Sequence, residues 1–134
     1  MLQNAARDRA NDRGFVFTSK GRRLRFPNGW KTYKASGLLI QATAADWNKE
    51  NIVWASQYCK EFGGGARLVL NTHDSYSFSV PPEGMREFWE GLKTRLESSD
   101  RSNVPLLLDL SGIGDNWWEA VSGAGYEHAS GELK

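Results

Sequence analysis

The sequence of 134 residues is long enough for one folded domain, and its 40% of hydrophobic residues excludes a disordered chain. No apolar run reaches the length of a membrane span, no signal peptide is recognisable, and the single cysteine, Cys59, excludes an intrachain disulfide. The net charge is +1, but residues 1–34 hold nine basic and two acidic side chains. This asymmetry indicates either a surface that faces a polyanion or a solvated basic arm. We expect a cytoplasmic protein.

The first predicted elements are a helix and a hairpin. Residues 2–13 are predicted to form the end of a helix that Gly14 terminates. Strands are predicted over residues 15–18 and 22–26, joined by a turn at residues 20–21.

The hairpin is strongly basic, since the stretch KGRRLRFPNG at residues 20–29 contains a lysine and three arginines. Such a cluster on a short hairpin is typical of a surface that contacts nucleic-acid phosphates. The alternative is an edge hairpin whose charges prevent aggregation. The candidate phosphate-contacting residues are Lys20, Arg22, Arg23 and Arg25.

Residues 33–62 have a helical pattern, which Gly63–Gly65 should end. Thr43 and Asp46 also fit a capping box, so an alternative start lies there. Gln41 lies in the apolar stretch LLIQATAAD, where small residues would let its amide reach minor-groove base edges. The residues expected on one apolar face are Ile40, Ala44, Trp47, Trp54, Tyr58 and Phe62.

The stretch LVLNTHDSYSFSV, residues 68–80, predicts a second hairpin with His73 and Asp74 at its tip. Aspartate is an ordinary turn residue. Because both flanking strands are expected to be buried, however, Asp74 would be held rigidly at the edge of a sheet, as a hard oxygen ligand for Mg²⁺. One carboxylate does not make a site for two metal ions.

After this hairpin, a helix is predicted to begin at residues 81–83, with Met85, Phe88, Trp89, Leu92 and Leu96 along its apolar face. A loop over residues 98–103, a strand over residues 104–110 and a turn with a short helix should follow. This order predicts an α+β fold in which helices back a small antiparallel sheet made of the 68–80 hairpin and the C-terminal strand.

Other kinds of chemistry have little support in the sequence. No cysteine or histidine cluster has zinc-ligand spacing, and the glycine run lacks the ending of a phosphate-binding loop. Neither Ser75 nor Cys59 has an evident base, and His128 is expected to be a solvated tail residue. The remaining acids, which show no comparable strand-end position, are Asp46, Glu50, Asp109 and Asp115.

Four stretches, taken in order, resemble the C-terminal part of family-A DNA polymerases, the DNA polymerase I type. The third is similar to the family's motif C, V-H-D-E, and the second to its I-Q-G-[ST]-A-A-D-x-x-K segment. The chain departs from that pattern with Ser75 in place of glutamate, Ala42 in place of glycine and Gly37 in place of asparagine. The four stretches are RGFVFTSKGRRLRFPNG, LLIQATAADWNK, ARLVLNTHDSYSFSVP and VPLLLDLSGIGDNWWEA.

The resemblance implies a role for each candidate residue. Asp74 would be the metal-binding aspartate of the palm, His73 would lie near the primer 3′ end and Gln41 would touch the primer–template minor groove. Arg22 and Arg23 would lie by the nucleic-acid backbone. The H-D-S sequence at 73–75 is also similar to single-subunit phage-type RNA polymerases, which remain an alternative.

The family's motifs A and B, with the second metal-binding aspartate and the triphosphate-gripping fingers helix, are not found in these residues. We therefore expect a single partial domain, with a basic part at 1–35 and a palm portion at 36–134. It would be the small subunit of a split, plausibly phage-encoded polymerase in the host cytoplasm. A larger chain would share two Mg²⁺ ions with it, and primer–template DNA and dNTPs would be bound between them. The alternatives are an inactive DNA-binding remnant or a truncated reading frame.

Overall fold

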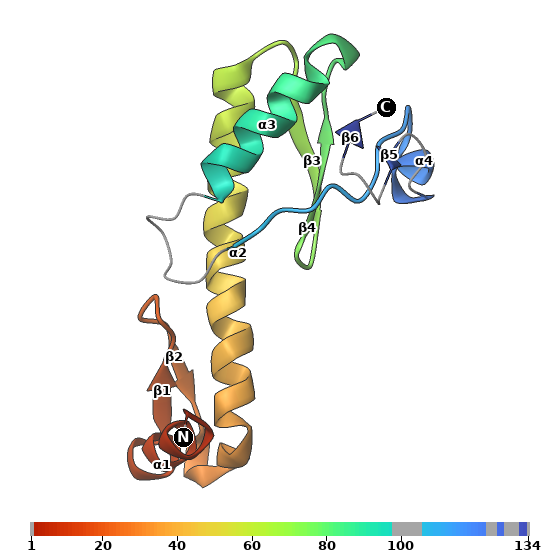
Figure 1. Cartoon of the computed structure of the whole chain (residues 1–134). Coiled ribbons are helices and arrows are strands. Elements are labelled where there is room, and N and C mark those ends of the chain that lie inside the picture. Colours follow the sequence, from red (N-terminus) through yellow and green to blue (C-terminus); the bar gives the residue numbers. More distant parts are fainter. Residues whose placement is uncertain (1, 98–105, 123–125, 128–131, 134) are drawn as a thin grey trace. The chain divides into compact units, whose positions relative to one another are not determined.

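The computed structural model describes residues 2–97, 106–122, 126–127 and 132–133 (Figure 1). The chain divides into two compact units, one of residues 1–53 and 71–76 and the other of residues 54–70 and 77–134. The helices are α1 (Leu2–Arg13), α2 (Ala35–Phe62), α3 (Met85–Leu96) and α4 (Trp117–Ser122), with 3₁₀ turns η1 (Pro27–Gly29), η2 (Thr32–Lys34) and η3 (Pro82–Gly84). The strands are β1 (Phe15–Phe17), β2 (Arg23–Arg25), β3 (Arg67–Thr72), β4 (Ser75–Ser79), β5 (Tyr126–Glu127) and β6 (Glu132–Leu133).

In the first unit, α1 ends as predicted at Gly14, whose φ of +72° suits the left-handed cap of a helix. The hairpin β1–β2 follows, antiparallel, with Val16 opposite Leu24. The core of this unit is small. Its alanines from α1 let that helix pack closely against the hairpin and the start of α2. The buried residues of this core are Ala6, Ala10, Val16, Phe26 and Ala35, with Leu24 and Leu39 packed against them.

The long predicted helix is confirmed as α2, but its first half differs from the expected pattern. It begins at Ala35, so the alternative start near Thr43 is wrong. Ile40 is 60% exposed, and Ala44 is exposed too, so the predicted apolar face does not extend through this half. Ala35 and Leu39, spaced by one helical turn, pack inward instead.

The second unit has the larger core, formed where α3 packs against the end of α2. The predicted apolar face of α3 is confirmed, since Phe88, Leu92 and Leu96 are buried. Rings of Tyr58, Phe62 and Phe78 surround Phe88. Partly buried residues around this core include Trp54, Ala66, Leu68, Val80, Trp89 and Leu108.

Strands β3 and β4 form the predicted hairpin, and within the described residues their sheet has two strands. The expected burial of both strands is wrong: Val69 is 56% and Leu70 44% exposed on β3, and the residues of β4 are at most partly buried. The predicted C-terminal strand is not formed over residues 106–110, and residues 104–105 lie outside the described part. The amide of Leu108 instead donates a hydrogen bond of 2.6 Å to Glu97 Oε1, so it does not pair with a strand.

The closing turn and short helix are confirmed as α4, and the small pair β5–β6 was not predicted. The predicted loop at 98–103 and His128 lie outside the described residues. Among the helices of the described part, none is long and apolar enough to cross a membrane. The predicted α+β class is confirmed, with separate two-stranded sheets.

The packing of α3 makes a substitution at Gly91 informative. Alanine normally stabilises a helix interior by about 1 kcal/mol relative to glycine. Here a Cβ atom at Gly91 would lie only 2.8 Å from Cζ of Tyr58, whose ring already contacts Phe88 at a centroid distance of 5.3 Å. We expect Gly91→Ala to lower the free energy of unfolding by about 1–3 kcal/mol, measured by urea denaturation.

The control is Gly37→Ala in α2, where an added Cβ meets nothing within 4 Å. It should raise the free energy of unfolding by up to about 1 kcal/mol. Equal stabilisation by both substitutions would contradict the packing of Tyr58 over Gly91.

Candidate metal and nucleic-acid site

The tip of the β3–β4 hairpin is a two-residue turn made by His73 and Asp74. His73 has a φ of 54°, and a positive φ at the first turn residue is what such tight hairpins require. The Ser75 hydroxyl donates to the Thr72 carbonyl at 2.9 Å, and Nδ2 of Asn71 donates to the Ser75 carbonyl at 3.1 Å. Ser75, which stands where the family has glutamate, therefore braces the turn through its hydroxyl.

A second set of hydrogen bonds ties this turn to α2. Nδ2 of Asn48 donates to the backbone carbonyl of His73, and the Tyr76 hydroxyl donates to Oδ1 of Asn48. The same hydroxyl also lies 3.3 Å from the Asn48 carbonyl. We call Asn48 and Tyr76 the tip clamp, because together they hold the residue before Asp74 and the strand after it.

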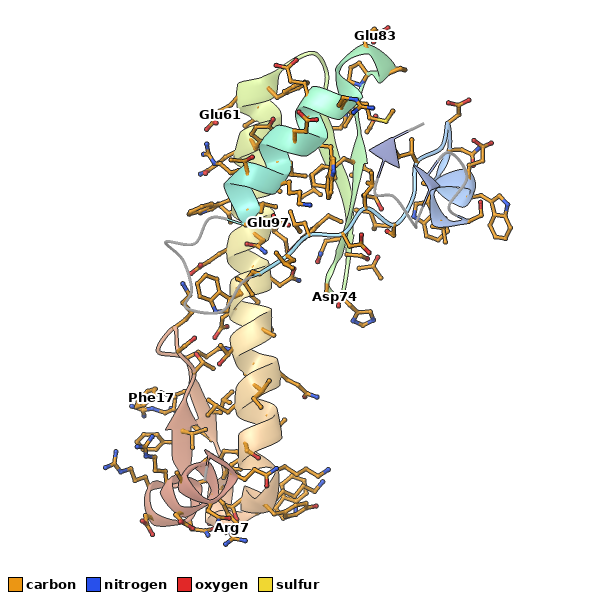
Figure 2. All side chains as sticks on the ribbon, in the orientation of Figure 1. Arg7, Phe17, Glu61, Asp74, Glu83 and Glu97 are labelled. Carbon is orange, nitrogen blue, oxygen red and sulfur yellow. The ribbon has the colours of Figure 1, made fainter. Side chains whose placement is uncertain are left out.

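Asp74 is exposed at the tip of the hairpin (Figure 2). Its carboxylate forms no hydrogen bond or ion pair with any residue that the structure describes. An unpaired carboxylate on a braced turn suits a hard cation such as Mg²⁺. Within the described residues no three His, Cys, Asp or Glu side chains lie together as a metal site. The chain thus offers one ligand for a metal centre that needs further ligands.

The basic hairpin is attached to α2 by two ion pairs. Nε of Arg22 lies 2.8 Å from Oδ1 of Asp46, and the same guanidinium donates to the Ala42 carbonyl at 2.7 Å. Lys20 lies 2.9 Å from Glu50 and 3.8 Å from the centre of the Trp47 ring. Two of the four candidate phosphate-contacting residues therefore already hold the hairpin in place.

The other two candidates on this hairpin differ in their surroundings. The Arg23 guanidinium lies over the rings of Phe15 and Phe17, at 4.6 and 5.4 Å from their centres. Arg25 is exposed and has no ion pair within the described part of the chain. No carboxylate of the described residues neutralises either charge, so both remain available to a polyanion.

Gln41 is exposed on α2, as a residue that contacts nucleic acid must be. It precedes Asn48 by seven residues, so the two lie on nearly the same helix face, about 10 Å apart along the axis. Since Asn48 bonds to the hairpin tip, Gln41 and the tip lie toward the same side of α2. Gln41 and the His73–Asp74 turn thus belong to the same compact unit.

Comparison with known proteins places the chain among DNA polymerases. It belongs to DNA polymerase family A, whose sequence model matches residues 2–119. The family predicted from the four stretches is therefore confirmed.

The relatives include "DNA polymerase DpoZ" of Vibrio phage phiVC8, 50% identical over 119 residues, which cover 89% of this chain and 18% of that protein. DNA polymerase I of Pseudomonas aeruginosa is 33% identical over 123 residues, covering 85% of this chain and 13% of that protein. This chain therefore spans less than a fifth of the length of these curated relatives.

A solved structure has a similar fold. It is the POL domain of Pol1 from M. smegmatis in complex with DNA primer-template and dNTP, with a TM-score of 0.69 and 25% identity. The match covers 78% of this chain and 20% of that chain.

Sequence reasoning missed the tip clamp. Asn48 and Tyr76 are separated by 28 residues, and neither residue has a spacing that indicates a partner. The sequence indicated Asp46 only as a capping residue or as an acid without a strand-end position, although it anchors the basic hairpin. The one available signal was that Asn48 and Asp46 are polar residues inside a helical run.

The tip clamp predicts a local effect of Asn48→Ala. This substitution removes the donor to the His73 carbonyl and the acceptor for Tyr76, at a cost of about 1–2 kcal/mol in the free energy of unfolding. Amide hydrogen exchange at residues 73–76 should accelerate. Tyr76→Phe should cost less, and the double variant should be less than additive because one hydrogen bond is shared. Gln57→Ala, at an exposed amide on α2, is the control. Unchanged exchange at the tip in Asn48→Ala would contradict the clamp.

The anchor of the basic hairpin should depend on pH. The Thr18 hydroxyl, 2.8 Å from Oδ2, and the Arg22 guanidinium hold the pKa of Asp46 below its ordinary value of 3.8, against the opposing effect of burial. A carboxyl group with a lowered folded-state pKa contributes stability that is complete above pH 3.8 and lost as the pH falls through the folded-state value. Asp46→Asn should therefore destabilise at neutral pH, and the difference from the wild type should shrink below pH 3.8. Urea denaturation across this range measures it. Asp12→Asn, at an exposed acid of α1, is the control for removing one carboxylate.

Proposed function

We propose that this chain is the C-terminal portion of the palm of a DNA-directed DNA polymerase, in which Asp74 binds a catalytic Mg²⁺ ion. The observation that carries the proposal is the unpaired, exposed carboxylate of Asp74 on a doubly braced hairpin tip in a member of DNA polymerase family A. When bound, Mg²⁺ ions activate the primer 3′-hydroxyl and neutralise charge on the triphosphate and the leaving pyrophosphate.

In this proposal the chain's own residues orient the DNA and one metal ligand. Asp74 supplies an anionic oxygen, and the tip clamp limits the directions in which it points. His73 lies beside it, near the primer end, and Gln41 reaches the minor groove of the primer–template from the same side of α2. Arg23 and Arg25 contact the DNA backbone through their free charges, while Lys20 and Arg22 position the hairpin that carries them.

A second carboxylate is needed to clamp two metal ions, and residues outside this sequence would supply it together with the triphosphate-binding fingers. We propose that these residues belong to a separate, larger chain. The two-stranded β3–β4 sheet of the described residues leaves the outer edge of β3 for a further strand, which supports this form of the proposal. The exposed side chains of Val69 and Leu70 offer apolar surface to the same residues.

The decisive experiment is primer extension with Mg²⁺ and the four dNTPs. It compares this chain alone, this chain with a polypeptide that carries the second carboxylate and the fingers, and the same pair with Asp74→Asn. We expect extension by the intact pair only. Asp74→Asn should lower the extension rate by more than about a hundredfold, because loss of a residue that only supports a metal ligand already lowers activity by up to that factor. The affinity for DNA should stay unchanged.

Glu83→Gln provides a matched control, because it removes one exposed carboxylate elsewhere in the chain. Normal turnover by Asp74→Asn would overturn the metal-ligand assignment. A stable pair that binds DNA without extending it would instead favour the second candidate, an inactive DNA-binding remnant. Extension with ribonucleotides only would favour the RNA polymerase, against the family match.

A further inference from the structure

The segment just before α2 presents two aromatic rings to solvent from a fixed backbone. Trp30 is 63% and Tyr33 66% exposed, although the neighbouring Thr32 is 8% exposed and Ala35 is fully buried. Thr32 and Ala35 attach the segment to the first unit, and η2 runs directly into α2. We call residues 30–34 the aromatic–basic segment.

A lysine ammonium group lies over each of the two rings in the aromatic–basic segment. Nζ of Lys31 lies 3.7 Å from the centre of the Trp30 ring, and Nζ of Lys34 lies 5.9 Å from that of Tyr33. Lys31 has a φ of 57°, a left-handed conformation that costs free energy for a residue other than glycine. The backbone thus holds a strained conformation in which a cation lies over a largely exposed indole ring.

The stretch of sequence around this segment is basic. Residues 14–45 contain six basic side chains and no acidic one. Lys20 and Arg22 form ion pairs with Glu50 and Asp46, which lie beyond this stretch. Lys31 and Lys34 have no ion pair with any residue of the described part. Their charges are therefore available to a polyanionic partner.

Largely exposed aromatic rings beside lysines without an ion pair fit one class of ligand particularly well, an unpaired nucleic-acid strand. Its bases stack on aromatic rings and its phosphates pair with the lysines. Duplex DNA offers phosphates but no open base faces, and an apolar protein partner would have to desolvate the two ammonium groups. We propose that the aromatic–basic segment binds unpaired template bases next to the primer–template duplex.

The position of the segment agrees with this ligand. Gln41, the proposed minor-groove contact, lies six residues into α2 from Ala35, about 9 Å along the helix axis. A single strand that leaves the duplex near Gln41 could therefore reach Trp30 and Tyr33. That the bound strand is the template rests on the proposed function, whereas the inference that the segment binds an unpaired strand does not.

The test measures DNA affinity of the assembled polymerase by fluorescence anisotropy, without dNTPs. The probes are a labelled primer–template with a single-stranded template overhang and the same duplex with blunt ends. The double variant Trp30→Ala/Tyr33→Ala should lose about tenfold in affinity for the overhang DNA, within the range for removing base stacking, and nothing for the blunt duplex. Lys31→Gln/Lys34→Gln should reduce the salt slope on overhang DNA by about 1.4, the value for two released single-strand contacts.

Two controls separate stacking from other effects. Trp30→Phe/Tyr33→Phe keeps both aromatic faces and should restore most of the affinity. Trp117→Ala/Trp118→Ala removes two rings that are 60% and 75% exposed in the other unit, and should leave overhang binding unchanged.

Equal losses on overhang and blunt DNA would overturn the proposal, because the segment would then contact duplex or another part of the polymerase. Unchanged affinity for both probes would overturn it as well. The Asp74→Asn variant separates a failure of this proposal from a failure of the catalytic proposal. It should abolish primer extension and still bind the overhang DNA more tightly than the blunt duplex. If extension survives Asp74→Asn but the overhang effect is seen, only the metal assignment fails.

Discussion

Asn48 holds the hairpin tip to α2 by donating its amide hydrogen to the His73 carbonyl and accepting one from the Tyr76 hydroxyl. A two-stranded hairpin alone is marginally stable, so its tip would fray without such bonds. Because the acceptor is the backbone of the residue before Asp74, the bond restricts the backbone from which the Asp74 carboxylate extends. The chemistry proposed for this chain depends on that restriction, since a metal ligand must be held in place before the metal binds.

Helix α2 supports both units with two different kinds of side chain. Its first half holds neighbouring segments through polar groups, with Asp46 bonded to Thr18 and Arg22 and with Glu50 bonded to Lys20. Its second half packs apolar rings and small residues against α3. The first half therefore holds the basic hairpin and the hairpin tip through polar bonds, while Leu38 and Ile40 of the same half are exposed.

The structure divides the basic residues near the N-terminus into those that form ion pairs within the chain and those that do not. Some cations of the basic end are structural, because Lys20 and Arg22 are bound to acids of α2. Others are unpaired in the described residues, among them Arg25, Lys31 and Lys34. On β3, Val69 and Leu70 add exposed apolar side chains to this picture.

The sequence by itself determined the elements that depend on local chemistry. Gly14 and Gly63–Gly65 ended helices, the apolar spacing of α3 chose its buried face, and the family followed from four ordered motifs. Only the tertiary structure decided which polar groups pair, because Asn48 and Tyr76 are 28 residues apart and either could face solvent. It also decided that residues 106–110 are not a strand and that Val69 is exposed. Strand pairing and burial depend on what lies alongside a segment, which its own residues do not specify.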